Sequence, residues 1–279
     1  MAEVVDTKRQ LLSDGFVLVP GVLSNREVQR LRSEVNRALD TFGINKSGGT
    51  VLPNAASEAP GLAWIFSHPR VIEAVRHASD LQTMVFTMEA DLHRNYIASA
   101  WHKDTGEQVI DTGYFGRDCF LNDECRVIKV ALYLQDHDTD KRALHVRSGT
   151  IHTPDLESGD PTPVRANAGD MVLFDVRITH RGVQKSMLDR GLFTLGKALS
   201  PRHPEAMATR LRRRQMALAG KPDRMAVYFA FGAPNENSVR FAQRNMGRQL
   251  AQLHKHASPL PESLAQAFEA SAIRTVDLS

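Results

Sequence analysis

Residues 170–180 carry the pattern that most restricts the fold of this chain, Asp-Met-Val-Leu-Phe-Asp-Val-Arg-Ile-Thr-His. Apolar side chains recur at every second position from 172 to 178, and alternate residues of a strand lie on one face. The same alternation places His180 on that apolar face. A histidine there is usually a hydrogen-bonded core residue, but the inner face of a β barrel is also where such a fold keeps metal ligands.

A second segment, Trp101-His102-Lys103-Asp104, supplies an imidazole and a carboxylate two residues apart. Together with His180 they give three ligands on one face of a metal and leave the opposite face open. An H-x-D triplet also arises by chance in a chain with 11 histidines. The run at 95–101, however, contains no Gly or Pro and predicts a strand that ends at His102. Structural zinc sites are closed and rich in Cys, so this set is more typical of a non-haem Fe(II) centre.

Three stretches around these ligands resemble the phytanoyl-CoA dioxygenase family of Fe(II)- and 2-oxoglutarate-dependent oxygenases, and the likeness extends over most of the chain. They are residues 12–24, residues 131–152 and residues 169–190. Within the second, Arg147-Ser148-Gly149-Thr150 departs from the family's loop, which usually ends in Pro-Gly-Ser-His. The resemblance implies a mainly β fold with flanking helices, a double-stranded β-helix of the jelly-roll, cupin-like barrel type.

The resemblance also implies the chemistry of the three ligands. His102, Asp104 and His180 are expected to bind Fe(II), with 2-oxoglutarate and O2 at the open positions, and succinate and CO2 as products beside the oxidised substrate. Related halogenases have a small residue in place of the metal carboxylate, so Asp104 favours oxidation of a C–H bond, whether by hydroxylation, ring closure or desaturation.

The far carboxylate of 2-oxoglutarate needs a planar cation, because an arginine offers a bidentate fork that a lysine lacks. Arg190 is the expected partner, and Arg224, at the start of another predicted strand, is the alternative. Ser186 and Thr194 are expected to add a hydroxyl contact.

The substrate is expected to be a small polar metabolite. Bacterial members of the family tailor secondary metabolites, some of them sugar-containing. The long loop at 106–126 is interpreted as a lid, and polar residues in and beside it, Lys103, Asp111, Arg117 and Asp123, favour a hydroxyl-rich substrate. A zinc-dependent hydrolase or a non-catalytic binding module on the same barrel is the alternative, and neither requires a 2-oxoglutarate arginine.

Composition sets the remaining expectations. The 279 residues are enough for one oxygenase domain, with a core at about 10–200 and a C-terminal extension at about 201–279. The net charge is only +3, no apolar run approaches the ~18 to 20 residues of a membrane span, and the acidic N-terminus is unlike a signal peptide. With two cysteines no disulfide framework is indicated. We therefore expect a cytoplasmic enzyme with a small-molecule substrate, no nucleic-acid partner and no membrane partner; the oligomeric state stays open.

Periodicity predicts helices at the front and end of the chain and strands in its centre. A capping box at Ser24 and Glu27 opens a helix at 25–40, and further helices are expected at 69–78, 204–219 and 239–256. The arginines of the 204–219 helix are interpreted as a solvated face. Residues 41–60 are expected to form a loop. The predicted strands are 82–90, 92–101, 127–135, 143–147, 171–179, 191–198 and 224–231.

Overall fold

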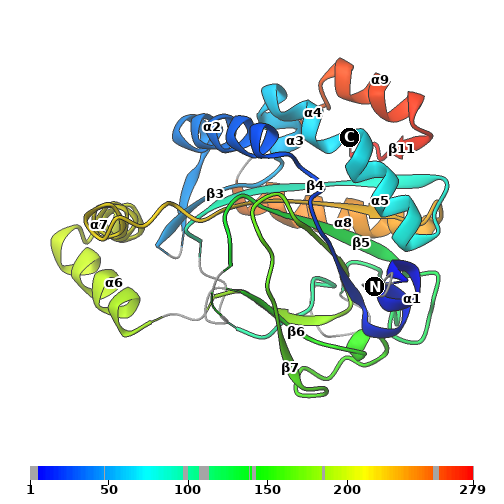
Figure 1. Cartoon of the computed structure of the whole chain (residues 1–279), viewed down its shortest axis with the longest axis horizontal. Coiled ribbons are helices and arrows are strands. Elements are labelled where there is room, and N and C mark those ends of the chain that lie inside the picture. The colour runs from blue at the N-terminus through cyan, green and yellow to red at the C-terminus, as the bar shows by residue number, and fades with distance from the viewer. Residues whose placement is uncertain are drawn as a thin grey trace.

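The computed structural model describes residues 6–278, except residue 47 and residues 97–99, 107–112, 138, 140–142, 184–185 and 254–257. Its described strands form two sheets that enclose a shared apolar layer (Figure 1). Every ladder is antiparallel except the pairing of β11 with β4. The molecule is therefore built mainly from antiparallel sheets, with helices around them.

The larger sheet runs in the order β1-β8-β5-β10-β4-β3-β2, and β11 pairs with β4 beside this path. Its strands are β1 (Phe16–Val19), β2 (Ile44–Lys46), β3 (Gly49–Leu52), β4 (Met84–Arg94), β5 (Val127–Tyr133), β8 (Met171–Asp175), β10 (Met225–Gly232) and β11 (Ile273–Thr275). The smaller sheet has the order β7-β6-β9, with β6 (Leu144–Arg147), β7 (Pro161–Val164) and β9 (Thr179–Arg181).

Helices cover the outer face of the larger sheet, where α2, α4, α5 and α9 lie above it in Figure 1. The described helices are α1 (Thr7–Asp14), α2 (Asn25–Phe42), α3 (Ala55–Glu58), α4 (Ala63–Phe66), α5 (Pro69–Ser79), α6 (Met187–Leu199), α7 (Pro204–Leu218), α8 (Glu236–Leu253) and α9 (Glu262–Ala270), with short 3-10 turns at Pro60–Leu62 and Thr150–His152. Among the described residues, no helix is long and apolar enough to cross a membrane.

Strand alternation separates the two apolar layers. In β5, Val130 and Leu132 face the helices, whereas Ala131 and Tyr133 face the smaller sheet. Both faces of a central strand are thus buried, which explains its nearly continuous apolar sequence. The polar side chain of Lys129 interrupts that run on the inner face, at the position where the cavity described below begins.

Several predicted elements are confirmed. Residues 25–42 form α2, with both bonds of the expected capping box between Ser24 and Glu27, and the helices at 69–78 and 204–219 correspond to α5 and α7. The predicted strand 82–90 lies in β4, which ends at Arg94. The prediction of a strand over 95–101 is wrong for its described residues, because Asn95 has a left-handed backbone (φ 58°) and the strand stops there. The predicted strand 171–179 is likewise broken: β8 ends at Asp175, residues 176–178 form a turn, and β9 begins at Thr179 in the smaller sheet. The predicted helix at 239–256 is α8, which begins at Glu236; its last predicted residues lie outside the described ones.

Two further predictions about local structure are wrong. Residues 191–198 are not a strand but part of α6, because Ser186 and Asp189 form a second capping box: the Asp189 N–H donates to Ser186 Oγ (3.1 Å), and the Ser186 N–H donates to Asp189 Oδ2 (2.9 Å). Residues 41–60 contain β2, β3 and α3 rather than a bare loop. The capping box determined the first segment and strand pairing the second. In both, the hydrophobic periodicity of so short a window is a weak guide to secondary structure.

Strand β10 lies in the centre of the larger sheet, between β5 and β4. The predicted core at about 10–200 leaves this strand out. Between β9 and β10 the chain makes the α6–α7 hairpin, which projects to one side of the sheets (Figure 1). Residues that follow His180 directly in sequence are therefore carried away from the sheets, and the chain returns to them at Arg224.

Candidate metal centre

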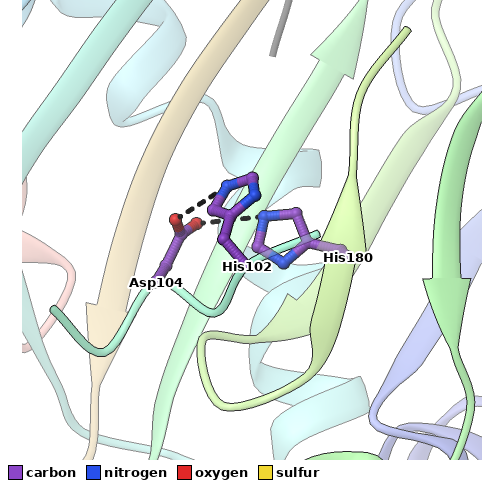
Figure 2. A group of neighbouring side chains, drawn as sticks. All are labelled: His102, Asp104 and His180. Carbon is purple, nitrogen blue, oxygen red and sulfur yellow. Dashed lines mark ion pairs between the residues drawn. The ribbon is translucent and has the colours of Figure 1, made fainter. Parts of the chain in front are cut away.

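His102, Asp104 and His180 come together at one point, as predicted (Figure 2). Their ligand atoms lie within 4.8 Å of one another. His102 Nε2 is 3.6 Å from Asp104 Oδ1, and His180 Nε2 is 3.5 Å from Asp104 Oδ2. Two imidazoles and one carboxylate that face a common point are a donor set suited to a divalent transition metal.

Backbone hydrogen bonds hold the two chain segments side by side. The His102 N–H donates to the His180 carbonyl, and the His180 N–H donates back to the His102 carbonyl, both at 2.9 Å. The Asp104 N–H donates to the Val176 carbonyl, also at 2.9 Å. Residues 102 and 104 point to the same side of an extended segment, so this pairing is sufficient to align all three ligands.

Both imidazoles are oriented by a second hydrogen bond. His102 Nδ1–H donates to the Ala100 carbonyl (2.9 Å) and His180 Nδ1–H to the Ile178 carbonyl (3.1 Å). A carbonyl only accepts, so each ring has its proton on Nδ1 and presents the lone pair of Nε2, which is the usual arrangement of a metal-binding histidine. Burial, and then the neighbouring His102, lower the pKa of His180 to about 3, so this ring is neutral at physiological pH.

Asp104 is held in its ionised form. Burial alone would raise the pKa of Asp104, but Lys129 and the two histidines outweigh it and hold the pKa well below its usual range. The ammonium of Lys129 donates to Asp104 Oδ2 at 2.7 Å and is also paired with Glu89 Oε1 at 2.5 Å. The site therefore offers the Nε2 atoms of two imidazoles and one anionic carboxylate, donors that a divalent metal can bind.

The three ligands lie in the wall of a cavity of about 650 Å³. Its described lining is rich in groups that form hydrogen bonds, with four tyrosines, three histidines and both signs of charge. Its polar and charged members include Lys46, Glu89, Asp91, His93, Lys129, Tyr133, Arg224 and Tyr228. A cavity of this size accommodates a small molecule.

The structure places the candidate residues for 2-oxoglutarate in two different regions. Arg190 is exposed on α6, Ser186 is the N-cap of that helix, and the Thr194 hydroxyl donates to the Arg190 carbonyl (3.1 Å). None of the three belongs to the described lining of the cavity. Arg224 does belong to it, together with Tyr133 and Tyr228, and the capping box of α6 explains why Arg190 is carried away.

The predicted lid at 106–126 is anchored over its described second half. Residues 107–112, with Asp111, lie outside the described residues. Beyond them, Tyr114 and Phe115 are buried against Phe241 of α8, with ring centroids 5.5 and 5.1 Å apart respectively. Gly106 and Tyr114 line the cavity. This part of the loop is therefore a packed wall of the site.

Of the polar residues expected to meet the substrate from this region, only Lys103 among those described lines the cavity. Its ammonium donates to two buried carbonyls, of Thr150 (2.7 Å) and Arg177 (2.6 Å). Arg117 and Asp123 are exposed and do not belong to the described lining. For these two the expectation is wrong, because buried residues of this segment, among them Tyr114, Phe115 and Phe120, face inward while the charges of Arg117 and Asp123 face solvent.

The loop that departs from the family pattern has contacts of its own. Arg147 lies over one side of the Trp101 ring, 4.6 Å from its centroid, and Arg181 lies 4.4 Å from the same centroid. Thr150 Oγ1 accepts from the Thr179 N–H (3.0 Å) and donates to the Arg147 carbonyl (2.7 Å). These contacts tie the loop to Trp101 and Thr179, which immediately precede His102 and His180.

Sequence reasoning missed the polar row on β4. Glu89, Asp91 and His93 alternate with the buried Ala90 and Leu92 and line the cavity. The alternation of Glu89, Asp91 and His93 with apolar residues could have revealed this row. Charged side chains at every second position of a buried strand share one face, and that face must line a polar space. Burial, and then Glu89, raise the pKa of Asp91 to about 7, and burial, with Lys129, lowers the pKa of His93 to about 3.

Comparison with known proteins identifies the fold. Neither a family model nor a curated protein sequence matches this chain. Among solved structures it is similar to those of non-haem enzymes that use 2-oxoglutarate (α-ketoglutarate), and at these low identities the likeness shows the fold. The carbocyclase SnoK from nogalamycin biosynthesis is 16% identical with a TM-score of 0.58, covering 94% of this chain and 95% of SnoK.

Two further neighbours have the same fold. The epimerase SnoN, also from nogalamycin biosynthesis, is 16% identical with a TM-score of 0.56 and a coverage of 81% of each chain. HygX from Streptomyces hygroscopicus, solved with nickel and 2-oxoglutarate, is 18% identical with a TM-score of 0.56, covering 84% of this chain and 88% of HygX.

Proposed function

We propose that this chain is a non-haem Fe(II)- and 2-oxoglutarate-dependent oxygenase that oxidises a C–H bond of a small polar metabolite. The observation that carries the proposal is the open-faced ligand set of His102, Asp104 and His180 in the wall of a polar cavity. The two facing sheets support its assignment to the double-stranded β-helix fold and to enzymes that resemble the phytanoyl-CoA dioxygenase family.

In this proposal each residue has a distinct task. The two Nε2 atoms and Asp104 hold Fe(II), which with 2-oxoglutarate and O2 supplies the oxidising chemistry and yields succinate and CO2. Lys129 keeps Asp104 ionised. Arg224 receives the far carboxylate of 2-oxoglutarate in a bidentate pair, and the buried Tyr133 and the partly buried Tyr228 beside it offer hydroxyl groups.

Arg224 is preferred to Arg190 because only Arg224 shares a cavity with the metal ligands in the described structure. Its backbone is fixed by Asn95: the Arg224 N–H donates to Asn95 Oδ1 (2.9 Å), and the Asn95 N–H donates to the Arg224 carbonyl (2.8 Å). A side chain on a fixed backbone in a half-buried position can select a carboxylate by shape as well as by charge.

The lining also supports a substrate with hydroxyl or amino groups. Glu89 Oε2 and Asp91 Oδ1 are buried and have no hydrogen-bond partner in the described protein. Such acceptors are costly unless a ligand or water satisfies them. HygX has been solved with hygromycin B bound and SnoN with nogalamycin RO; a metabolite of comparable polarity is our candidate substrate.

The proposal is tested by anaerobic titration of the purified protein with Fe(II) and 2-oxoglutarate. We expect the weak visible charge-transfer band of an iron–2-oxoglutarate chelate, and its loss in His102→Ala. A protein that binds zinc but gives no such band with iron would instead be a hydrolase or a binding module, and would refute the oxygenase.

A further inference from the structure

Lys129 is a buried ammonium whose position protein stability does not explain. It lies in β5, between β8 and β10, with only 7% of its surface exposed. Placing an ammonium there costs several kcal/mol of desolvation, and a buried ion pair is on average no more stabilising than apolar side chains of similar volume. A methionine would continue the apolar run of this strand. The lysine therefore points to a requirement of the site.

Its two partners show what that requirement is. Lys129 Nζ lies 2.5 Å from Glu89 Oε1 and 2.7 Å from Asp104 Oδ2. One ammonium thus joins a strand of the rigid sheet to the carboxylate of the candidate metal centre. Asp104 Oδ2 therefore accepts from Lys129 and also lies 3.5 Å from His180 Nε2. The other oxygen, Oδ1, lies 3.6 Å from His102 Nε2 and has no lysine or arginine partner among the described residues.

Glu89 is aimed at this lysine by an irregularity of β4. The register between β4 and β10 shifts so that Phe229 pairs with Ala90 while Phe231 pairs with Phe86. Three residues of β4 consequently lie opposite the single Ala230, and Met88 in their middle has a left-handed backbone (φ 62°). Bulges of this kind redirect side chains and are common beside active sites.

Another buried lysine of the cavity provides a contrast. Lys103 is also buried, but its ammonium donates to two backbone carbonyls and lies 5.4 Å from the centroid of the Phe120 ring, and it thereby ties loops together. Within the described residues, the ammonium of Lys129 instead pairs with two carboxylates. An ammonium that bonds one oxygen of a ligating carboxylate restricts its rotation, so that the carboxylate binds through the other oxygen and leaves neighbouring coordination positions open.

We propose that Lys129, held by Glu89, is a positioning residue that fixes Asp104 as a one-oxygen metal ligand. The inference rests on the proposed metal site and deepens it. The alternative role is purely electrostatic, in which the lysine only balances the charge of two carboxylates. The two roles separate when the ammonium and the Glu89 charge are removed together, because the net charge of the site is then unchanged while the bond to Asp104 is lost.

The experiment is an anaerobic titration of the metal-free protein with Co(II), followed by its visible d–d absorption. Lys129→Met and the double variant Lys129→Met/Glu89→Gln are compared with wild type. The control is Lys46→Met, which removes a lysine of the cavity wall that, among the described residues, forms no ion pair with His102, Asp104 or His180. Loss of an outer partner of a metal ligand typically weakens binding by about 10- to 100-fold. We expect that loss in both Lys129 variants, with altered d–d bands, and no change in Lys46→Met.

The other possible results of the Co(II) titration also distinguish the two roles of Lys129. If the double variant binds Co(II) as tightly as wild type with the same spectrum, Lys129 acts through charge alone and the positioning role is refuted. The single variant could fail to fold because it leaves the Glu89 carboxylate buried and unpaired. In that case the double variant, in which Glu89 is replaced by an uncharged glutamine, still distinguishes the positioning role from the electrostatic role. If wild type itself binds no Co(II), or binds it equally well after His102→Ala, the metal site is wrong and the proposed function fails with the inference.

Discussion

Replacement of Arg224 by lysine is the sharpest test of how the cavity binds 2-oxoglutarate. The guanidinium can form two parallel charge-assisted hydrogen bonds with a carboxylate, and an ammonium forms one. The backbone of Arg224 is fixed by its two hydrogen bonds with Asn95, so the shorter-reaching lysine cannot be re-aimed by a shift of the chain. Loss of one such bond costs about 1.5 to 3 kcal/mol.

That free energy corresponds to a rise of about 10- to 150-fold in the dissociation constant of 2-oxoglutarate. The measurement is the anaerobic titration of the Fe(II)-loaded protein with 2-oxoglutarate, followed at the charge-transfer band. The matched control is Arg190→Lys, which we expect to leave the constant within a factor of about two, as is usual for exposed positions. A large effect of Arg190→Lys together with no effect of Arg224→Lys would refute our assignment and restore Arg190.

Three further outcomes are expected. His102→Ala and Asp104→Ala should each abolish Fe(II) binding, measured by equilibrium dialysis, with an unchanged circular dichroism spectrum; tight binding in either would remove that ligand from the site. Phe241→Ala should lower the free energy of unfolding by about 3 to 5 kcal/mol and speed proteolysis within residues 106–126. In the wild type, cleavage there should slow once Fe(II) and 2-oxoglutarate bind. Normal stability of the variant would show that the aromatic contacts do not anchor this loop. Because the pKa of His93 is lowered to about 3 in the folded protein, the unfolded chain binds one more proton between about pH 3 and 6.5. The free energy of unfolding of the metal-free protein should therefore rise with pH across that window, by up to about 1.4 kcal/mol per pH unit for this residue. Urea unfolding at pH 4.5, 5.5 and 6.5 should show a smaller rise in His93→Phe, and an equal rise would contradict the lowered pKa of His93.

The ligands were predictable from local spacing and from the family resemblance. The spacing of His102 and Asp104 places them on one short segment, and the resemblance pointed to both histidines. The alternation from 172 to 178 was not a sound reason for His180, because a turn at 176–178 separates β8 from β9, and His180 lies in the other sheet, with its ring 4.9 Å from that of Phe174. The mainly β architecture was expected from the resemblance, and the alternating runs indicated the strand-rich centre. The paired backbone bonds of His102 and His180 bring the two ligand segments together.

The parts that were missed depend on contacts between distant segments. The helix at 204–219 between β9 and β10 was predicted, but residues 191–198 were interpreted as a strand, so the helical hairpin that carries Arg190 away from His180 was missed. The bond between Lys129 and Asp104 depends on the register of two strands, which a sequence period does not fix. The bulge at Met88 is a local break in such a register, and no glycine marks it.

The pairing of β1 with β8 has a consequence for the way in which this chain is made. Phe16 pairs with Phe174, so β1 is synthesised more than 150 residues before its partner strand. Until then its backbone N–H and C=O groups on that edge are open to any neighbouring strand. When many copies are translated at the same time, residues 16–19 of different chains should therefore pair with one another. Slower translation, or chaperone binding before residues 171–174 are made, should raise the yield of correctly folded protein.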